Sequence, residues 1–188
     1  MESITDQHFE NIVFTKDDLE LAEYAYCTFK QCSFSKVSLS NMRFQDSIFK
    51  ACDLSNANIN NASFQKVTFK ECKMLGLHFT TCSSFGFAID FKNCILQHTS
   101  FYQVDLRQSS FDQCNLAEAD MTEADLRNVA LSNCNLERTA FKGTNLEGTD
   151  LLGSINFTID PEINKLKGAK FAIPEVLRLL DKYKLIIE

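Results

Sequence analysis

Large apolar residues recur at every fifth position along most of the chain. A first unbroken series comprises Phe9, Phe14, Leu19, Tyr24, Phe29, Phe34, Leu39, Phe44, Phe49, Leu54, Ile59, Phe64, Phe69, Met74 and Phe79. A second comprises Phe91, Leu96, Phe101, Leu106, Phe111, Leu116, Met121, Leu126, Leu131, Leu136, Phe141, Leu146 and Leu151. Helices place apolar residues three and four positions apart, and strands two apart, so neither explains this spacing. The period of five predicts a repeat protein.

A small residue, mostly Ala or Cys, stands two positions before many of the large ones, often followed by Asp or Asn. Cys52-Asp53-Leu54 and Ala124-Asp125-Leu126 are examples. This pattern, over roughly residues 7–153, resembles the Ala-Asp/Asn-Leu-X-X motif of the pentapeptide-repeat family. The resemblance implies an all-β fold, a right-handed quadrilateral β-helix. In that solenoid the large and small residues point inward, and four pentapeptides form one coil.

The cysteines support a four-sided coil independently. Six of them are separated by 20 residues within each triplet and by 22 between the triplets: Cys32, Cys52, Cys72, Cys94, Cys114 and Cys134. Twenty residues are four pentapeptides, so these thiols should form a vertical ladder in the small inward position. Metal binding or vertical disulfides are alternatives, but buried thiols act as small hydrophobes.

The interval of 22 places a two-residue insertion near residues 80–90, where the large-residue pattern also slips by two. We expect a bulge there, with Phe85 or Phe87 taking the place of the missing large residue. The bulge is either a local accommodation or a kink that contacts a partner.

The repeat ends near residue 153, which predicts a solenoid over residues 1–153 and a C-terminal helical cap over 154–188. Asp160-Pro161 is a helix-start signal, and Pro174–Tyr183 carries apolar residues at helical spacing. Leu185–Ile187 would suit a short strand. The tail is richer in apolar residues than a small cap can bury, which predicts a homodimer interface at Phe171, Ile173, Leu177, Leu180, Ile186 and Ile187.

Residues 159–164 and the segment that follows are similar to the C-terminus of the microcin B17 immunity protein, and more loosely to Qnr and MfpA. This resemblance implies a tail-to-tail dimer whose rod imitates duplex DNA and binds DNA gyrase or topoisomerase IV. It also implies immunity or resistance to topoisomerase poisons. Qnr proteins of Gram-negative bacteria carry sizeable projecting loops, and no insertion of that length interrupts this chain.

Charge and composition exclude several other classes. The 188 residues carry a formal net charge of -6, which argues against a general nucleic-acid binder. No run of 18 apolar residues suggests a membrane span, and residues 1–6 lack the features of a signal peptide. We therefore expect a cytoplasmic protein with reduced thiols.

No catalytic constellation, phosphate-binding loop or Cys-x-x-Cys pair is present in the sequence. His8, His78 and His98 are far apart and stand at positions expected to face solvent. The sequence therefore predicts a non-enzymatic protein without a cofactor or metal.

Acidic residues are concentrated in residues 101–150, where nine acids and four bases give a net charge of -5. The predicted partner-binding surface comprises Asp105, Asp112, Glu118, Asp120, Glu123 and Asp125. Such a surface would compete with DNA for a basic groove. The alternatives are an ordinary solvated face and a generic interaction scaffold with an unrelated partner.

Overall fold

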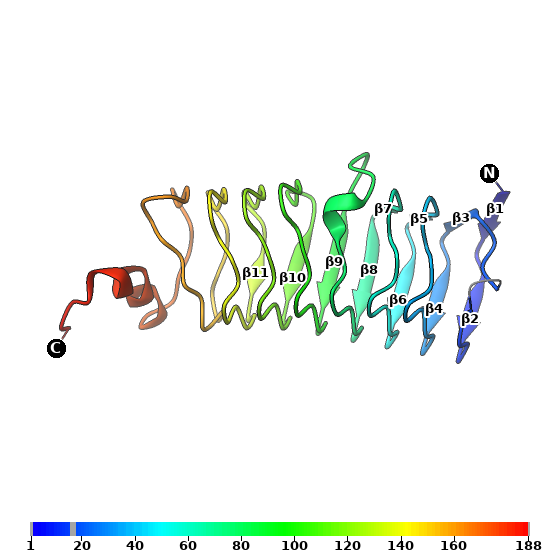
Figure 1. The fold of residues 1–188 in the computed structure, drawn as a ribbon, viewed down its shortest axis with the longest axis horizontal. Helices are drawn as coiled ribbons and strands as arrows, with labels where there is room; N and C mark the ends of the chain where they lie inside the picture. The colour runs from blue at the N-terminus through cyan, green and yellow to red at the C-terminus, as the bar shows by residue number, and fades with distance from the viewer. Residues whose placement is uncertain (1, 16–17, 188) are drawn as a thin grey trace.

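The computed structural model describes residues 2–15 and 18–187, which form a rod of stacked coils (Figure 1). Each side of a coil has only five residues, so the strands are short. They are β1 Glu2–Thr5, β2 His8–Glu10, β3 Ala22–Ala25, β4 Thr28–Lys30, β5 Arg43–Gln45, β6 Ile48–Lys50, β7 Ser63–Gln65, β8 Val67–Lys70, β9 Ile89–Lys92, β10 Ser110–Asp112 and β11 Leu131–Ser132. The described residues also form two 3₁₀ helices, η1 Phe79–Thr81 at the start of the register break and η2 Glu175–Tyr183 near the C-terminal end.

All strand pairs are parallel, and partners lie one coil apart in the sequence. Phe9 pairs with Phe29, and Phe29 with Phe49, each 20 residues further on. The sheets have the orders β1-β3-β5-β7 and β2-β4-β6-β8-β9-β10-β11. The predicted four-sided β-solenoid is therefore confirmed.

We name the four sides of the rod by their inward columns. Face A is the seven-stranded sheet. Face B carries the column Leu96, Leu116 and Leu136; face C carries Phe101, Met121 and Phe141; face D carries Leu106, Leu126 and Leu146. Isolated parallel bridges connect successive coils on faces B, C and D, such as Ile95↔Asn115, Ser100↔Asp120 and Asp105↔Asp125. The sheet β1-β3-β5-β7 forms the N-terminal half of face D.

Stacked aromatic rings fill the interior behind face A. The ring centroids of Phe29 and Phe49 are 4.6 Å apart, and those of Phe49 and Phe69 are 4.8 Å apart. Phe44 on face D meets Phe49 edge-on at 5.3 Å. Offset stacks and edge contacts both suit the ring quadrupole, so adjacent columns lock together.

The predicted cysteine ladder points inward. All six of its thiols are buried and free, and each sulfur donates a hydrogen bond to the carbonyl oxygen of a face A phenylalanine. The Cys52 Sγ is 3.4 Å from the Phe29 carbonyl oxygen, and the Cys114 Sγ is 3.5 Å from that of Phe91. The thiols therefore pack the core.

Cys52 and Cys114 should consequently resist thiol reagents in the native protein, because each side chain is only 2% exposed. Labelling with a maleimide, counted by mass spectrometry, should leave both unmodified until denaturant is added, after which all eight cysteines should react. Rapid native labelling of both would contradict the inward ladder.

The register break is confined to one face. On face A, β8 pairs directly with β9 across a 22-residue interval, Phe69 with Phe91. On face D the sheet ends at β7, and a loop over residues 82–88 projects from the rod after η1 (Figure 1). Phe87 is 7% exposed and fills the interior, whereas Phe85 is 79% exposed. Phe87 is thus the substitute for the missing large residue.

The coil continues beyond residue 153, through the bridges Asn145↔Lys165 and Asp150↔Lys170. The predicted helix start at Asp160 is wrong, because residues 161–163 form a turn. Asn164 explains the difference. Its buried amide oxygen accepts a hydrogen bond from the Thr144 backbone N–H at 2.8 Å, and its Nδ2 donates to the Phe141 carbonyl at 2.7 Å. These bonds return the chain to the coil.

The helix predicted after Pro174 is confirmed as η2. The strand predicted at Leu185–Ile187 is wrong, because these residues follow η2 away from the last coil. Within the described part of the chain they have no strand partner, and all three are exposed.

Candidate protein-interaction surfaces

The six predicted acidic residues all lie on the outside of the rod, but not on one face. Asp112 lies on face A. The other five lie around faces C and D: Asp120 on face C, Asp105 and Asp125 on face D, and Glu118 and Glu123 at the corners that bound face C. The structure therefore brings five of the six to one side and separates Asp112 from them.

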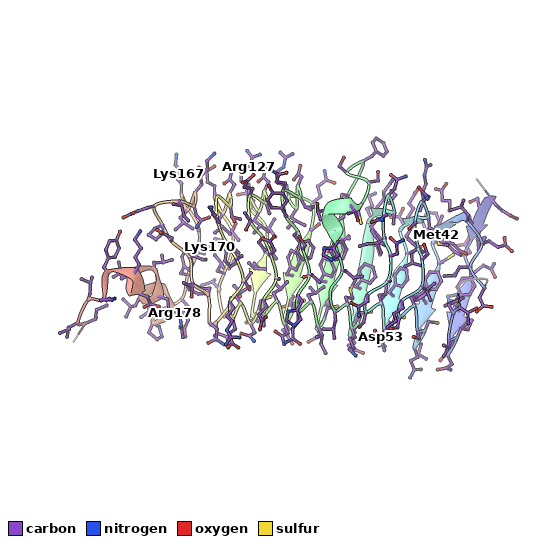
Figure 2. All side chains as sticks on the ribbon, viewed as in Figure 1. Met42, Asp53, Arg127, Lys167, Lys170 and Arg178 are labelled. Atoms are coloured by element: carbon purple, nitrogen blue, oxygen red, sulfur yellow. The ribbon has the colours of Figure 1, made fainter. Side chains whose placement is uncertain are left out.

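Arginines neutralise the two aspartates of face D. The Arg107 Nη2 lies 2.6 Å from Asp105 Oδ2, and the Arg127 Nη2 lies 2.6 Å from Asp125 Oδ2. Arg107 also reaches Asp125 at 3.6 Å, in the coil above. Hydrogen bonds from these guanidinium groups lower the pKa of both carboxyls. Two acids and two bases leave this cluster near neutral. Figure 2 labels Arg127, which projects outward from the rod.

The corner and face C acids differ in their partners. Glu118 accepts a hydrogen bond from Arg138 at 3.2 Å and lies 3.4 Å from the His98 ring. Glu123 accepts one from the neutral Gln103 amide at 2.7 Å, and Asp120 accepts one from the backbone of Thr122. Among the residues that the structure describes, neither Asp120 nor Glu123 has a basic group within 4.0 Å. Unpaired negative charge is thus sparser than the sequence indicates.

The second predicted surface lies at the C-terminal end. Ile173 and Ile186 are 86% and 91% exposed, and Leu177 and Ile187 are also exposed. Leu180 is half-buried. Phe171 is half-buried and packs on the buried Phe157, with ring centroids 5.5 Å apart. Four of the six predicted interface residues therefore present apolar surface to solvent.

An ionic anchor holds η2 against the last coil. The Lys182 Nζ lies 2.6 Å from Asp160 Oδ1 and 2.8 Å from Glu162 Oε2. The Tyr183 hydroxyl also donates to Glu162 at 2.6 Å. Figure 2 shows this segment, with Arg178 labelled, lying beyond the last coil. The anchor gives the exposed apolar side chains of this end a defined position.

Face A also carries a column of lysines that was not predicted from the sequence. Lys30, Lys50, Lys70 and Lys92 are successive partners in the register of the seven-stranded sheet. Each lysine directly follows a phenylalanine of the face A column in the sequence. The lysines therefore recur at the interval of one coil, and this interval could have revealed the column. We call these four residues the lysine ladder.

The three histidines are exposed, as predicted. Across residues 2–15 and 18–187, no group of three His, Cys, Asp or Glu side chains is arranged to hold a metal ion. In the same residues, no helix combines the length and apolar character needed to cross a membrane.

A family model described as "Pentapeptide repeat region" matches residues 2–79 and 87–155, and the gap between the two segments overlaps the loop over residues 82–88. Two solved structures of trypsin-treated QnrB1 variants share the fold, both at 20% identity. QnrB1 is a plasmid-mediated fluoroquinolone resistance protein. The first match has a TM-score of 0.68 and covers 99% of this chain and 100% of the QnrB1 chain. The second match has a TM-score of 0.69 and covers 98% of this chain and 99% of the QnrB1 chain.

HetL, a pentapeptide repeat protein involved in heterocyst differentiation regulation from the cyanobacterium Nostoc sp. strain PCC 7120, is more distant. It has a TM-score of 0.45 and 18% identity, covering 89% of this chain and 84% of HetL. No curated protein sequence matches the chain.

Proposed function

Because the chain belongs to the pentapeptide-repeat family, we propose that it is a non-enzymatic protein that binds DNA gyrase or topoisomerase IV in place of DNA. Such binding would give immunity or resistance to topoisomerase poisons. QnrB1, which has the same fold over nearly its full length, supports this proposal as a fluoroquinolone resistance protein.

The observation that carries the proposal is the acidic side of the rod around face C. Glu118, Asp120 and Glu123 follow one another on outward positions of one coil, and the last two have no basic partner among the described residues. Duplex DNA carries about one charge per 1.7 Å of axis, whereas coils repeat about every 4.8 Å. A sparser mimic needs acids clustered on one side, as they are here.

Charge reversal on this side should weaken binding. The triple variant Glu118→Lys, Asp120→Lys and Glu123→Lys should bind gyrase about 10-fold or more weakly at low salt, because steering toward a basic groove depends on the local field. Binding of the wild type should fall as salt rises. All three side chains face outward, so the fold should be retained.

The measurement is gyrase binding, together with a supercoiling assay with and without a quinolone or microcin. The matched control is Glu2→Lys, Asp6→Lys and Glu20→Lys, with the same change in charge at the other end of the rod. Equal binding by wild type and triple variant, or no binding of wild type at low salt, would exclude DNA mimicry by this surface.

We also propose that the protein is a homodimer through its C-terminal end. The double variant Ile173→Asp and Ile186→Asp should be monomeric, because each change puts a charge into the interface. Sedimentation at micromolar concentration measures this, with Val13→Asp and Leu21→Asp as a control at exposed apolar residues elsewhere. A wild-type protein that sediments as a monomer would rule the dimer out.

A generic interaction scaffold with an unrelated partner is the second candidate. Arg107, Arg127 and Arg138 favour it, because they neutralise half of the predicted acidic surface. A folded wild-type protein that neither binds gyrase nor changes its supercoiling activity would support this alternative.

A further inference from the structure

The lysine ladder places four like charges directly above one another on face A. Neighbouring strands are about 4.8 Å apart, and like charges opposite each other destabilise a sheet. Glu10 precedes the ladder in the register and lies 2.7 Å from Lys30, and Glu71 lies 3.8 Å from Lys70. Within the described residues, Lys50 and Lys92 have no acidic group within 4.0 Å. Asp112 follows Lys92 in the register, so an acidic residue stands at each end of the ladder. Between these two acids the ladder is a line of four positive charges in a protein of net charge -6.

The spacing of the lysines indicates which kind of acidic partner can pair with all of them. Three steps of about 4.8 Å span about 14 Å. Acidic residues at positions i, i+3, i+7 and i+10 of an α-helix span about 15 Å, since the rise is about 1.5 Å per residue. In an extended peptide, residues on the same side are about 6.7 Å apart. This spacing is wider than that of the lysines, so only the first acidic residues would lie opposite a lysine. A helix therefore meets all four ammonium groups.

The column of residues beside the lysines on face A argues against nucleic acid as the binding partner. Beside the lysines run the outward residues Thr28, Ile48, Thr68 and Asp90, and Ile48 is 45% exposed. Binding of single strands relies on exposed aromatic rings that stack on bases, and the aromatic residues of this face point inward. Three of the four residues in this column are uncharged, which instead suits the side of an amphipathic helix.

We propose that the lysine ladder is the docking site for the acidic face of an α-helix in a partner protein. The four ammonium groups pair with carboxylates of successive helical turns, and Ile48 contacts an apolar residue beside them. The ladder lies on face A, away from Glu118, Asp120 and Glu123, so this surface is separate from the proposed topoisomerase surface.

A synthetic helical peptide tests the proposal. The probe is a fluorescein-labelled alanine-rich peptide with glutamates at positions i, i+3, i+7 and i+10, and the control peptide has the same composition with glutamates on all sides. Anisotropy at low salt should show tighter binding of the one-sided peptide. The double variant Lys50→Gln and Lys70→Gln should bind it about 2- to 25-fold more weakly, since one exposed ion pair changes an equilibrium constant by about 1.5- to 5-fold.

The matched control variant is Lys36→Gln and Lys142→Gln, with the same charge change at exposed positions outside the ladder; its affinity should equal that of the wild type. Thermal unfolding checks the fold, and the ladder variant should melt no lower than wild type because like-charge repulsion is relieved. The proposal is overturned if the two peptides bind equally or if the ladder variant binds like wild type. Tighter binding of single-stranded DNA or of anionic phospholipid vesicles at the same salt also overturns it.

Discussion

Replacement of Phe49 by alanine is expected to lower the free energy of unfolding by about 3–5 kcal/mol. The ring is fully buried between those of Phe29 and Phe69, whose centroids lie 4.6 and 4.8 Å from its own. Phe44 packs edge-on against it. Backbone hydrogen bonds fix the separation of the coils above and below, so the cavity cannot collapse. The lost contacts are therefore not recovered.

Urea unfolding followed by circular dichroism measures this loss. Ile48→Ala is the control on the same strand, because that side chain is 45% exposed and its removal should cost less than about 1 kcal/mol. A Phe49→Ala variant with an equally small loss would mean that the stacked column does not dominate the stability of this region.

Truncation after Gly153 is expected to cause aggregation. It removes Lys165 and Lys170, whose backbone pairs with Asn145 and Asp150, and Asn164, which satisfies the Thr144 N–H and the Phe141 carbonyl. The last coil would then expose an unpaired edge and its buried apolar side chains, which is a template for aggregation.

Truncation after Ala172 is the matched control. It keeps the bridges at Lys165 and Lys170 and removes only η2 and the exposed residues around it. This variant should be soluble and monomeric, whereas the shorter one should precipitate. Light scattering of the two proteins at equal concentration distinguishes them, and a soluble, monodisperse Gly153 truncation would contradict the capping role of residues 154–172.

The periodic part of the fold was predictable because one local rule repeats. A large residue every five positions points inward in every coil, so Phe9, Phe49 and Phe111 could be assigned to one column from spacing alone. The tail follows no period. Its conformation depends on single contacts such as the buried Asn164 side chain, and a helix-start signal at Asp160 could not reveal them.

The net charge of each part of the surface is harder to predict from the sequence, because it depends on ion pairs within and between coils. Asp105-Leu106-Arg107 and Asp125-Leu126-Arg127 share a spacing of two that puts acid and base side by side, a signal that segment charge totals conceal. The lysine ladder becomes visible only when the sequence is read at the interval of one coil.

The loop at residues 82–88 has a consequence for how this rod can acquire new sequence. Face A passes the break with its pairing intact, so the added residues leave the stacked columns in phase. Lengthening a flexible loop costs only about 0.6 kcal/mol for each doubling. Ser84 and Phe85 therefore mark a permissive site, where a peptide epitope or a small domain can be grafted while the coils on either side keep their register.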